Sequence, residues 1–229
     1  MKKLDIKLNT IYFKKKKNKN MNIIDKSIYE NLNLLEPDLR GWHSEHPIFK
    51  NLIEEIRPST IVEVGTWKGL SAINMARITQ DIGLETKIYC IDTWLGGFQL
   101  WDDCKESKET DLLQKNGYPQ IYYQFLSNVV HCNLQDIIIP FPNTSSIGYR
   151  YLSSNQINPE LIYIDGSHDE DDVYLDLKYY YDLLKEGGTI FGDDYNWEGV
   201  KNAVINFCSN KNIEKEIIDD HFWIIKKLK

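Results

Sequence analysis

The chain has 229 residues, 42% of them hydrophobic and 27% charged, which fits one well-buried globular domain and leaves too little chain for two. Its net charge of -7 is uneven, because residues 1–20 carry eight lysines and one aspartate (+7) and the other residues therefore sum to -14. An acidic body excludes a nucleic-acid-binding surface, since phosphate contacts need clustered Lys and Arg.

Residues 1–25 are predicted to be a basic, disordered leader ahead of a single domain at 26–229. The lysines would also suit an arm that binds phosphate or a membrane surface, or an unused stretch upstream of a second start at Met21. The leader lacks the apolar stretch of a secretory signal, and nothing later approaches the ~18–20 apolar residues of a membrane span. Four widely spaced cysteines indicate reduced thiols. We therefore expect a cytoplasmic protein with no membrane partner.

The first half of the domain alternates helical and strand patterns. Apolar residues at helical spacing predict a helix over 48–57, which Pro58 ends. A short apolar run at 61–64 predicts a buried strand, and it leads through the glycine loop GTWKG (65–69) into a helix at 70–80. A second buried strand is expected at 87–92.

The same alternation continues to the end of the chain. The remaining predicted elements are strands at 128–133, 161–165 and 189–194, helices at 171–184 and 198–208, and a strand pair at 213–218 and 221–228. Near-continuous apolar strands separated by helices predict an α/β fold, a Rossmann-like doubly wound, mostly parallel sheet with an antiparallel C-terminal hairpin. The polar, aromatic stretch 94–120 is too long for an ordinary connection and is predicted to be a lid-like insertion. Tyr179–Tyr181 are consecutive on a predicted helix, so they cannot all face the core and at least one should be exposed. An exposed tyrosine there would suit a contact between subunits of a homo-oligomer.

Ligands of open parallel sheets bind beyond the carboxyl ends of the strands. Gly65 and Gly69 follow the first strand, where missing side chains let backbone amides approach a ligand, and Asp92 ends the next strand, where a carboxylate can bind a ribose diol. Glu63 discriminates among nucleotide cofactors, because a carboxylate there suits the cationic methionine end of S-adenosylmethionine and would repel a pyrophosphate. The spacing also differs from the Gly-x-Gly-x-x-Gly of dinucleotide-binding loops.

These segments resemble a known family. IVEVGTWKGLSAINMA (61–76) and IYCIDTWLGG (88–97) resemble the first two motifs of class I methyltransferases, and more narrowly the branch of macrolide-sugar O-methyltransferases and cephalosporin-hydroxylase-like proteins. The likeness runs from about Gly41 to Phe207. It implies that Glu63, Gly65, Gly69 and Asp92 bind S-adenosylmethionine. The stretch 137–146 resembles the segment that passes the adenine, which implies a contact from Ser145.

Three aspartates are expected at the same sheet edge. Asp165 ends the predicted fourth strand, and Asp193 and Asp194 end the fifth. Carboxylates that converge there would repel one another unless they were neutralised. Oxygen ligands favour a hard cation, and Mg²⁺ would keep waters for a substrate to displace. Catechol O-methyltransferases, which this resemblance includes as more distant relatives, have Asp-Asn where this chain has Asp-Asp, so which of Asp193 and Asp194 binds the metal directly stays open.

His168 follows Asp165 by three residues, in a polar loop beside the predicted metal, where a histidine is suited to proton transfer. The resemblance implies the same role, because metal-dependent O-methyltransferases place their general base at that position, and in the sugar branch it is a histidine. The predicted function is methyl transfer from S-adenosylmethionine to a hydroxyl of a sugar or glycan. Two alternatives stay open: a hydroxylase-like relative that uses the same acidic site, and a cofactor-binding module without turnover.

Overall fold

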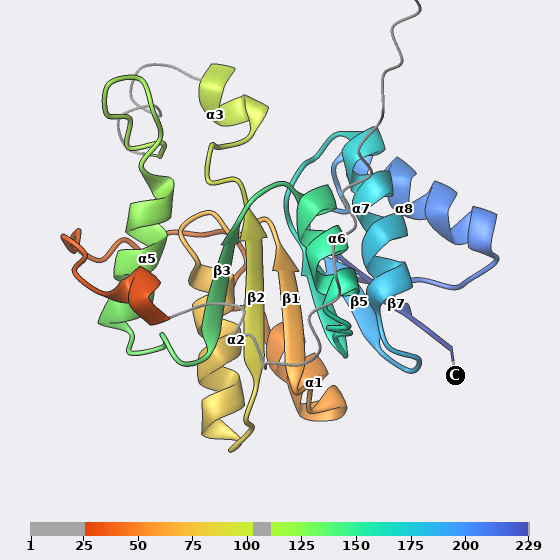
Figure 1. The fold of residues 1–229 in the computed structure, drawn as a ribbon. Helices are drawn as coiled ribbons and strands as arrows, with labels where there is room; N and C mark the ends of the chain where they lie inside the picture. Colours follow the sequence, from red (N-terminus) through yellow and green to blue (C-terminus); the bar gives the residue numbers. More distant parts are fainter. Residues whose placement is uncertain (1–25, 103–110, 229) are drawn as a thin grey trace, which may run out of the picture.

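The computed structural model describes residues 26–102 and 111–228 (Figure 1), so the predicted leader and part of the predicted insertion lie outside the described residues. The strands are β1 (Thr60–Val64), β2 (Lys87–Asp92), β3 (Ile138–Pro142), β4 (Leu161–Ile164), β5 (Thr189–Gly192), β6 (Glu216–Ile218) and β7 (Phe222–Lys226). They form one sheet in the order β3-β2-β1-β4-β5-β7-β6. β1 to β5 pair in parallel, whereas β7 runs antiparallel to both β5 and β6. The predicted fold class is confirmed.

Helices cover both faces of the sheet (Figure 1). One face packs against α1 (Pro47–Ile56), α2 (Leu70–Asp81) and α5 (Ile121–His131), and the other against α6 (Ser145–Ser154), α7 (Glu170–Leu183) and α8 (Glu198–Lys211). Each face has its own apolar core, because strands buried on both sides present alternate side chains to opposite helical layers.

α1 shows how local sequence sets an element. Pro47 occupies the first helical turn, where its missing N–H costs nothing, and the His46 side chain accepts a hydrogen bond from Ile48 N at 3.2 Å. Four apolar residues at helical spacing are buried, namely Ile48, Phe49, Leu52 and Ile53. Arg57 then adopts a left-handed conformation (φ 50°) and donates its N–H to Ile53 O, and Pro58 prevents continuation.

The predicted third strand at 128–133 is wrong. Residues 128–131 are the end of α5 and residues 132–133 form the turn after it, whereas the third strand is β3, which begins at Ile138. A short apolar run cannot by itself distinguish a strand from a buried helical turn. Pro140 and Pro142 masked the real strand, but β3 pairs only with β2 and is therefore an edge strand, which tolerates proline.

The three consecutive tyrosines and part of the predicted insertion lie among the described residues. Tyr180 and Tyr181 are buried and Tyr179 is half-buried and stacked on Tyr149 (centroids 5.0 Å apart), so none of the three is fully exposed. In the predicted insertion, α3 (Phe98–Asp102) lies beyond the carboxyl end of β2 (Figure 1). No helix among the described residues is long and apolar enough to cross a membrane.

Candidate active site

The glycine loop joins β1 to α2 at the point where the strand order reverses, with β2 on one side of β1 and β4 on the other. Gly65 has φ +82°, and a Cβ there would lie 2.2 Å from the backbone oxygen of Asp165. Gly69 has φ +88°, and its Cβ would lie 2.8 Å from the Phe125 ring. Both glycines therefore have a packing reason to be glycine, and their contact with a cofactor stays a prediction.

Asp92 binds the glycine loop through backbone N–H groups. Its Oδ2 accepts from Thr66 N and Trp67 N, both at 2.8 Å, and its Oδ1 accepts from Trp94 N at 2.7 Å. An ionised carboxylate offers about four acceptor sites, so roughly one remains for a ligand hydroxyl. Asp92 lies at the end of β2, as predicted, but most of the hydrogen bonds that its carboxylate can accept come from the backbone of the loops around it.

Glu63 is fully buried on β1. It accepts hydrogen bonds from Ser71 Oγ and, at 3.5 Å, from Cys90 Sγ. Burial raises the pKa of its carboxyl to about 7, although these two hydrogen bonds oppose the shift. Its predicted role at the methionine end of a cofactor is untested.

The raised pKa of Glu63 gives a prediction for stability. The carboxyl titrates near 4.5 when unfolded and near 7 when folded, so ionisation penalises the folded state as pH rises from 4.5 to 7. Glu63→Gln removes this penalty. The unfolding free energy of the variant relative to wild type should therefore be about 2–3 kcal/mol higher at pH 8 than at pH 4.5. Urea denaturation at both pH values tests this. The exposed control Glu85→Gln should follow wild type, and parallel behaviour of Glu63→Gln and wild type would refute the assignment.

Ser145 begins α6, directly after β3. Its backbone oxygen accepts from the Tyr180 hydroxyl at 2.8 Å, and its side chain hydrogen-bonds Asp176 of α7. The preceding loop lies beside the end of β2, since Asn143 N donates to Asp92 O at 2.9 Å. The adenine contact predicted for Ser145 is untested, and the described partners of this residue belong to α7.

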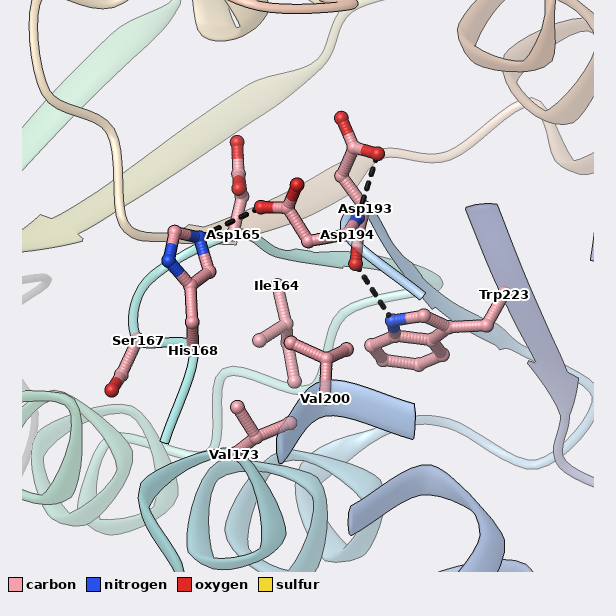
Figure 2. A pocket seen from close by; sticks show the side chains of 9 residues that line it. All are labelled: Ile164, Asp165, Ser167, His168, Val173, Asp193, Asp194, Val200 and Trp223. Carbon is pink, nitrogen blue, oxygen red and sulfur yellow. Dashed lines mark hydrogen bonds and ion pairs between the residues drawn. The ribbon is translucent and has the colours of Figure 1, made fainter. Parts of the chain in front are cut away.

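The ends of β4 and β5 bring Asp165, His168 and Asp194 together. Each offers a ligand atom, and these atoms lie within 4.8 Å of one another. His168 Nε2 lies 2.7 Å from Asp194 Oδ2, and Asp165 Oδ2 accepts from the Tyr163 hydroxyl at 3.0 Å. The three side chains line one pocket, as Figure 2 shows. A cavity volume of about 10 Å³ suits an ion or a single water.

Charge at this edge favours a cation. Burial raises the pKa of Asp165 well above its usual range, and the neighbouring Asp194 and Asp193 carboxylates raise it further. A divalent cation would offset that repulsion, and the oxygens of the Asp165 and Asp194 carboxylates are of the kind that Mg²⁺ prefers as ligands. The residues present therefore fit the predicted metal.

Asp193 lines the same pocket, but its ligand atoms do not belong to this group. Its Oδ1 accepts from Asp194 N at 2.7 Å and its Oδ2 lies 3.0 Å from His43 Nδ1, so both oxygens are occupied. Figure 2 shows its carboxylate directed away from His168. Together with His43 and His221 it forms a second group of ligand atoms within 4.8 Å of one another. The pairing of β5 with β7 brings His221 to this edge, and no motif in the sequence predicts that contact.

Two residues without a predicted role surround His168. Trp197 stacks on its ring with centroids 4.5 Å apart, and Gln99 Nε2 of α3 lies 3.5 Å from its Nδ1. When Nε2–H donates to Asp194, Nδ1 carries the lone pair. The basic atom of His168 therefore faces the predicted insertion.

The N-terminal segment is attached to the glycine loop. Lys68 Nζ lies 2.7 Å from Asp38 Oδ2, although the Lys68 side chain is completely buried. Asn128 Nδ2 donates to the backbone oxygens of both Asp38 (2.7 Å) and Lys68 (2.8 Å). This attachment was not predicted, because it links residues 30 to 90 positions apart in sequence.

Comparison with known proteins gives the family. The model of the methyltransferase domain matches residues 62–195, which is more than half of the chain. Among solved structures, the chain is similar to the O-methyltransferase NovP (16% identity, TM-score 0.60, 81% of this chain and 80% of that chain). It is also similar to an O-methyltransferase from Bacillus cereus in complex with SAH (15%, 0.54, 90% and 94%) and to TomG from Streptomyces achromogenes in complex with SAM (12%, 0.56, 84% and 83%). No curated protein sequence matched.

At such identities the similar structures show the fold, whereas the match to the family model covers the glycine loop, Asp92 and the acidic edge. The chain belongs to the methyltransferase-domain family.

Proposed function

We propose that the chain is an S-adenosylmethionine-dependent O-methyltransferase that uses a divalent cation, Mg²⁺, and acts on a hydroxyl of a sugar or glycan. The observation that carries this proposal is the convergence of Asp165, His168 and Asp194 at the sheet edge that also holds Asp92. The similar structures from Bacillus cereus and of TomG contain SAH and SAM, which supports the cofactor.

Within this proposal Asp165 and Asp194 hold the cation. Asp193 was predicted as a third ligand. Its Oδ1 accepts a hydrogen bond from Asp194 N and its Oδ2 lies next to His43 Nδ1, and its binding to the same ion stays a prediction. A bound divalent cation supplies Lewis acidity, which lowers the pKa of a hydroxyl next to it. The position of the two carboxylates fixes where that hydroxyl must lie.

His168 would take the proton at Nδ1. Asp194 accepts from Nε2–H, which fixes the tautomer and stabilises the imidazolium that forms. Trp197 restricts rotation of the ring by stacking on it. Because Nδ1 faces Gln99, the acceptor hydroxyl would enter from the side of α3. Attack on the methyl group then depends mainly on positioning.

The acceptor class rests on the resemblance to the sugar-modifying branch and on the predicted insertion at 94–120, of which α3 carries Gln99 next to His168. A cytoplasmic location and a homo-oligomer also remain predictions.

Metal binding gives a direct test of the site. We expect Asp165→Asn to weaken Mg²⁺ binding at least tenfold, because it removes one of the two carboxylates that hold the cation, and loss even of a hydrogen-bond partner of a metal ligand costs roughly 10–100-fold in affinity. Calorimetric titration of Mg²⁺ into the S-adenosylmethionine-loaded chain measures this. The matched control is Asp171→Asn, an exposed acid in the first turn of α7, which should bind Mg²⁺ like wild type. Equal Mg²⁺ affinity in the two variants would refute the proposed Mg²⁺ site.

A further inference from the structure

The second group of ligand atoms, His43, Asp193 and His221, comes from three separate parts of the chain. His43 lies in the segment before α1, Asp193 directly follows β5, and His221 directly precedes β7. The histidine rings have centroids 4.6 Å apart, and Tyr195 N donates to His221 O at 2.8 Å, which fixes the turn before β7 next to the end of β5. The three donors are therefore brought together by the tertiary fold.

Two observations point to an ion at this group. Nδ1 of His221 is buried and has no hydrogen-bond partner among the described residues; such an atom is rare and marks a place for an ion or a water. His43 Nδ1 lies 3.0 Å from Asp193 Oδ2 and is hydrogen-bonded to it. An ion would take the place of the proton between these two atoms, since neighbouring ligands of one metal ion are roughly 3–3.5 Å apart when their bonds to it are about 2.0–2.2 Å.

The donor set differs in chemistry from the first group. Two imidazoles and one carboxylate suit Zn²⁺ and other first-row transition dications, whereas carboxylate and water suit Mg²⁺. The His43 side chain is 44% exposed and Asp193 is 3% exposed, so the group is buried at its carboxylate and open to solvent at one imidazole. An ion can enter from solvent, and a water can complete its coordination.

We propose that His43, Asp193 and His221 form a second metal site, which takes a transition dication such as Zn²⁺ and joins the N-terminal segment and the C-terminal turn to the edge of the sheet. This site goes beyond the proposed methyl transfer. It needs neither S-adenosylmethionine nor an acceptor, and its ion would bind whether or not Mg²⁺ occupies the first group.

Cobalt spectroscopy on the full chain without a polyhistidine tag tests the site. After chelator treatment, the chain is titrated with Co²⁺ in excess Mg²⁺, and Zn²⁺ is then added. We expect visible absorption bands that saturate at one equivalent of Co²⁺, that one equivalent of Zn²⁺ removes, and that accompany a rise in Tm. His43→Gln and His221→Gln should each weaken binding by at least tenfold, and His131→Gln, which changes an exposed histidine on α5, should not.

Asp165→Asn distinguishes the two groups, because it should weaken Mg²⁺ binding at least tenfold and leave the Co²⁺ bands unchanged. Absence of a saturable site in wild type, equal affinity in all three histidine variants, or loss of the bands in Asp165→Asn would overturn the proposal. If a variant fails to fold, ring-nitrogen NMR of wild type decides. Zn²⁺ must shift the signals of His43 and His221 and not that of His131, and any other pattern refutes the site.

Discussion

Replacing His168 with glutamine is expected to lower kcat by about 10²–10⁴-fold, the usual contribution of a general base. Glutamine keeps a polar side chain of similar reach beside Asp194 and Trp197, but it cannot take a proton at the position of Nδ1. S-adenosylmethionine affinity should stay within a few fold of wild type, because no described contact joins His168 to the glycine loop or Asp92.

Single-turnover rates of methyl transfer measure the effect of His168→Gln, and added imidazole separates chemistry from structure. Imidazole supplies a base of the same type, so it should restore part of the rate to His168→Ala, which leaves room for the imidazole ring, and none to Asp165→Asn. His131→Gln, on the far helix α5, is the control and should have wild-type kcat. Unchanged turnover in His168→Gln would show that another group takes the proton.

Replacing Gly65 with alanine is expected to lower the unfolding free energy by about 2–5 kcal/mol. Part of this loss is the left-handed backbone conformation, roughly 1–2 kcal/mol for a residue with a Cβ. The rest is steric, since that Cβ would meet the Asp165 backbone oxygen at 2.2 Å, and forced repacking costs about 1–3 kcal/mol. Because the end of β4 must move, Mg²⁺ affinity should fall as well.

Gly83→Ala is the matched control for this substitution. Gly83 also has a positive φ, +70°, but a Cβ there would meet no atom within 4 Å. It therefore reports the backbone cost alone, and the difference between the two variants in urea denaturation gives the cost of the contact with Asp165. Equal losses in the two variants would show that β1 and β4 do not depend on this close approach.

The strand-end residues were predictable because one rule governs them. Parallel strands finish at one edge, so Asp92 after β2 and Asp165 after β4 had to lie near the glycine loop. The layout of the fold followed from buried apolar runs such as 61–64, since strands covered on both faces are continuously apolar. The exception was β3, where prolines obscured an edge strand.

The different positions of the Asp193 and Asp194 side chains could also have been predicted from the sequence. Successive side chains of a strand point to opposite faces, so two adjacent aspartates do not readily serve one site. Asp194, with φ +60°, bends the chain toward His168, while Asp193 stays with His43. The contacts of His43 and His221 could not be predicted, because the first depends on how the segment before α1 packs against the end of β5 and the second on the pairing of β7 with β5.

The central claim is metal-assisted methyl transfer to a hydroxyl. Its most direct test is incorporation of labelled methyl from S-adenosylmethionine into a panel of sugars, nucleotide-sugars and small polyols, with Mg²⁺ or with EDTA. We predict transfer to oxygen in Mg²⁺ and its loss in EDTA, with activity restored when Mg²⁺ is returned in excess. Equal incorporation under both conditions, or a methyl group found on nitrogen, would contradict the account.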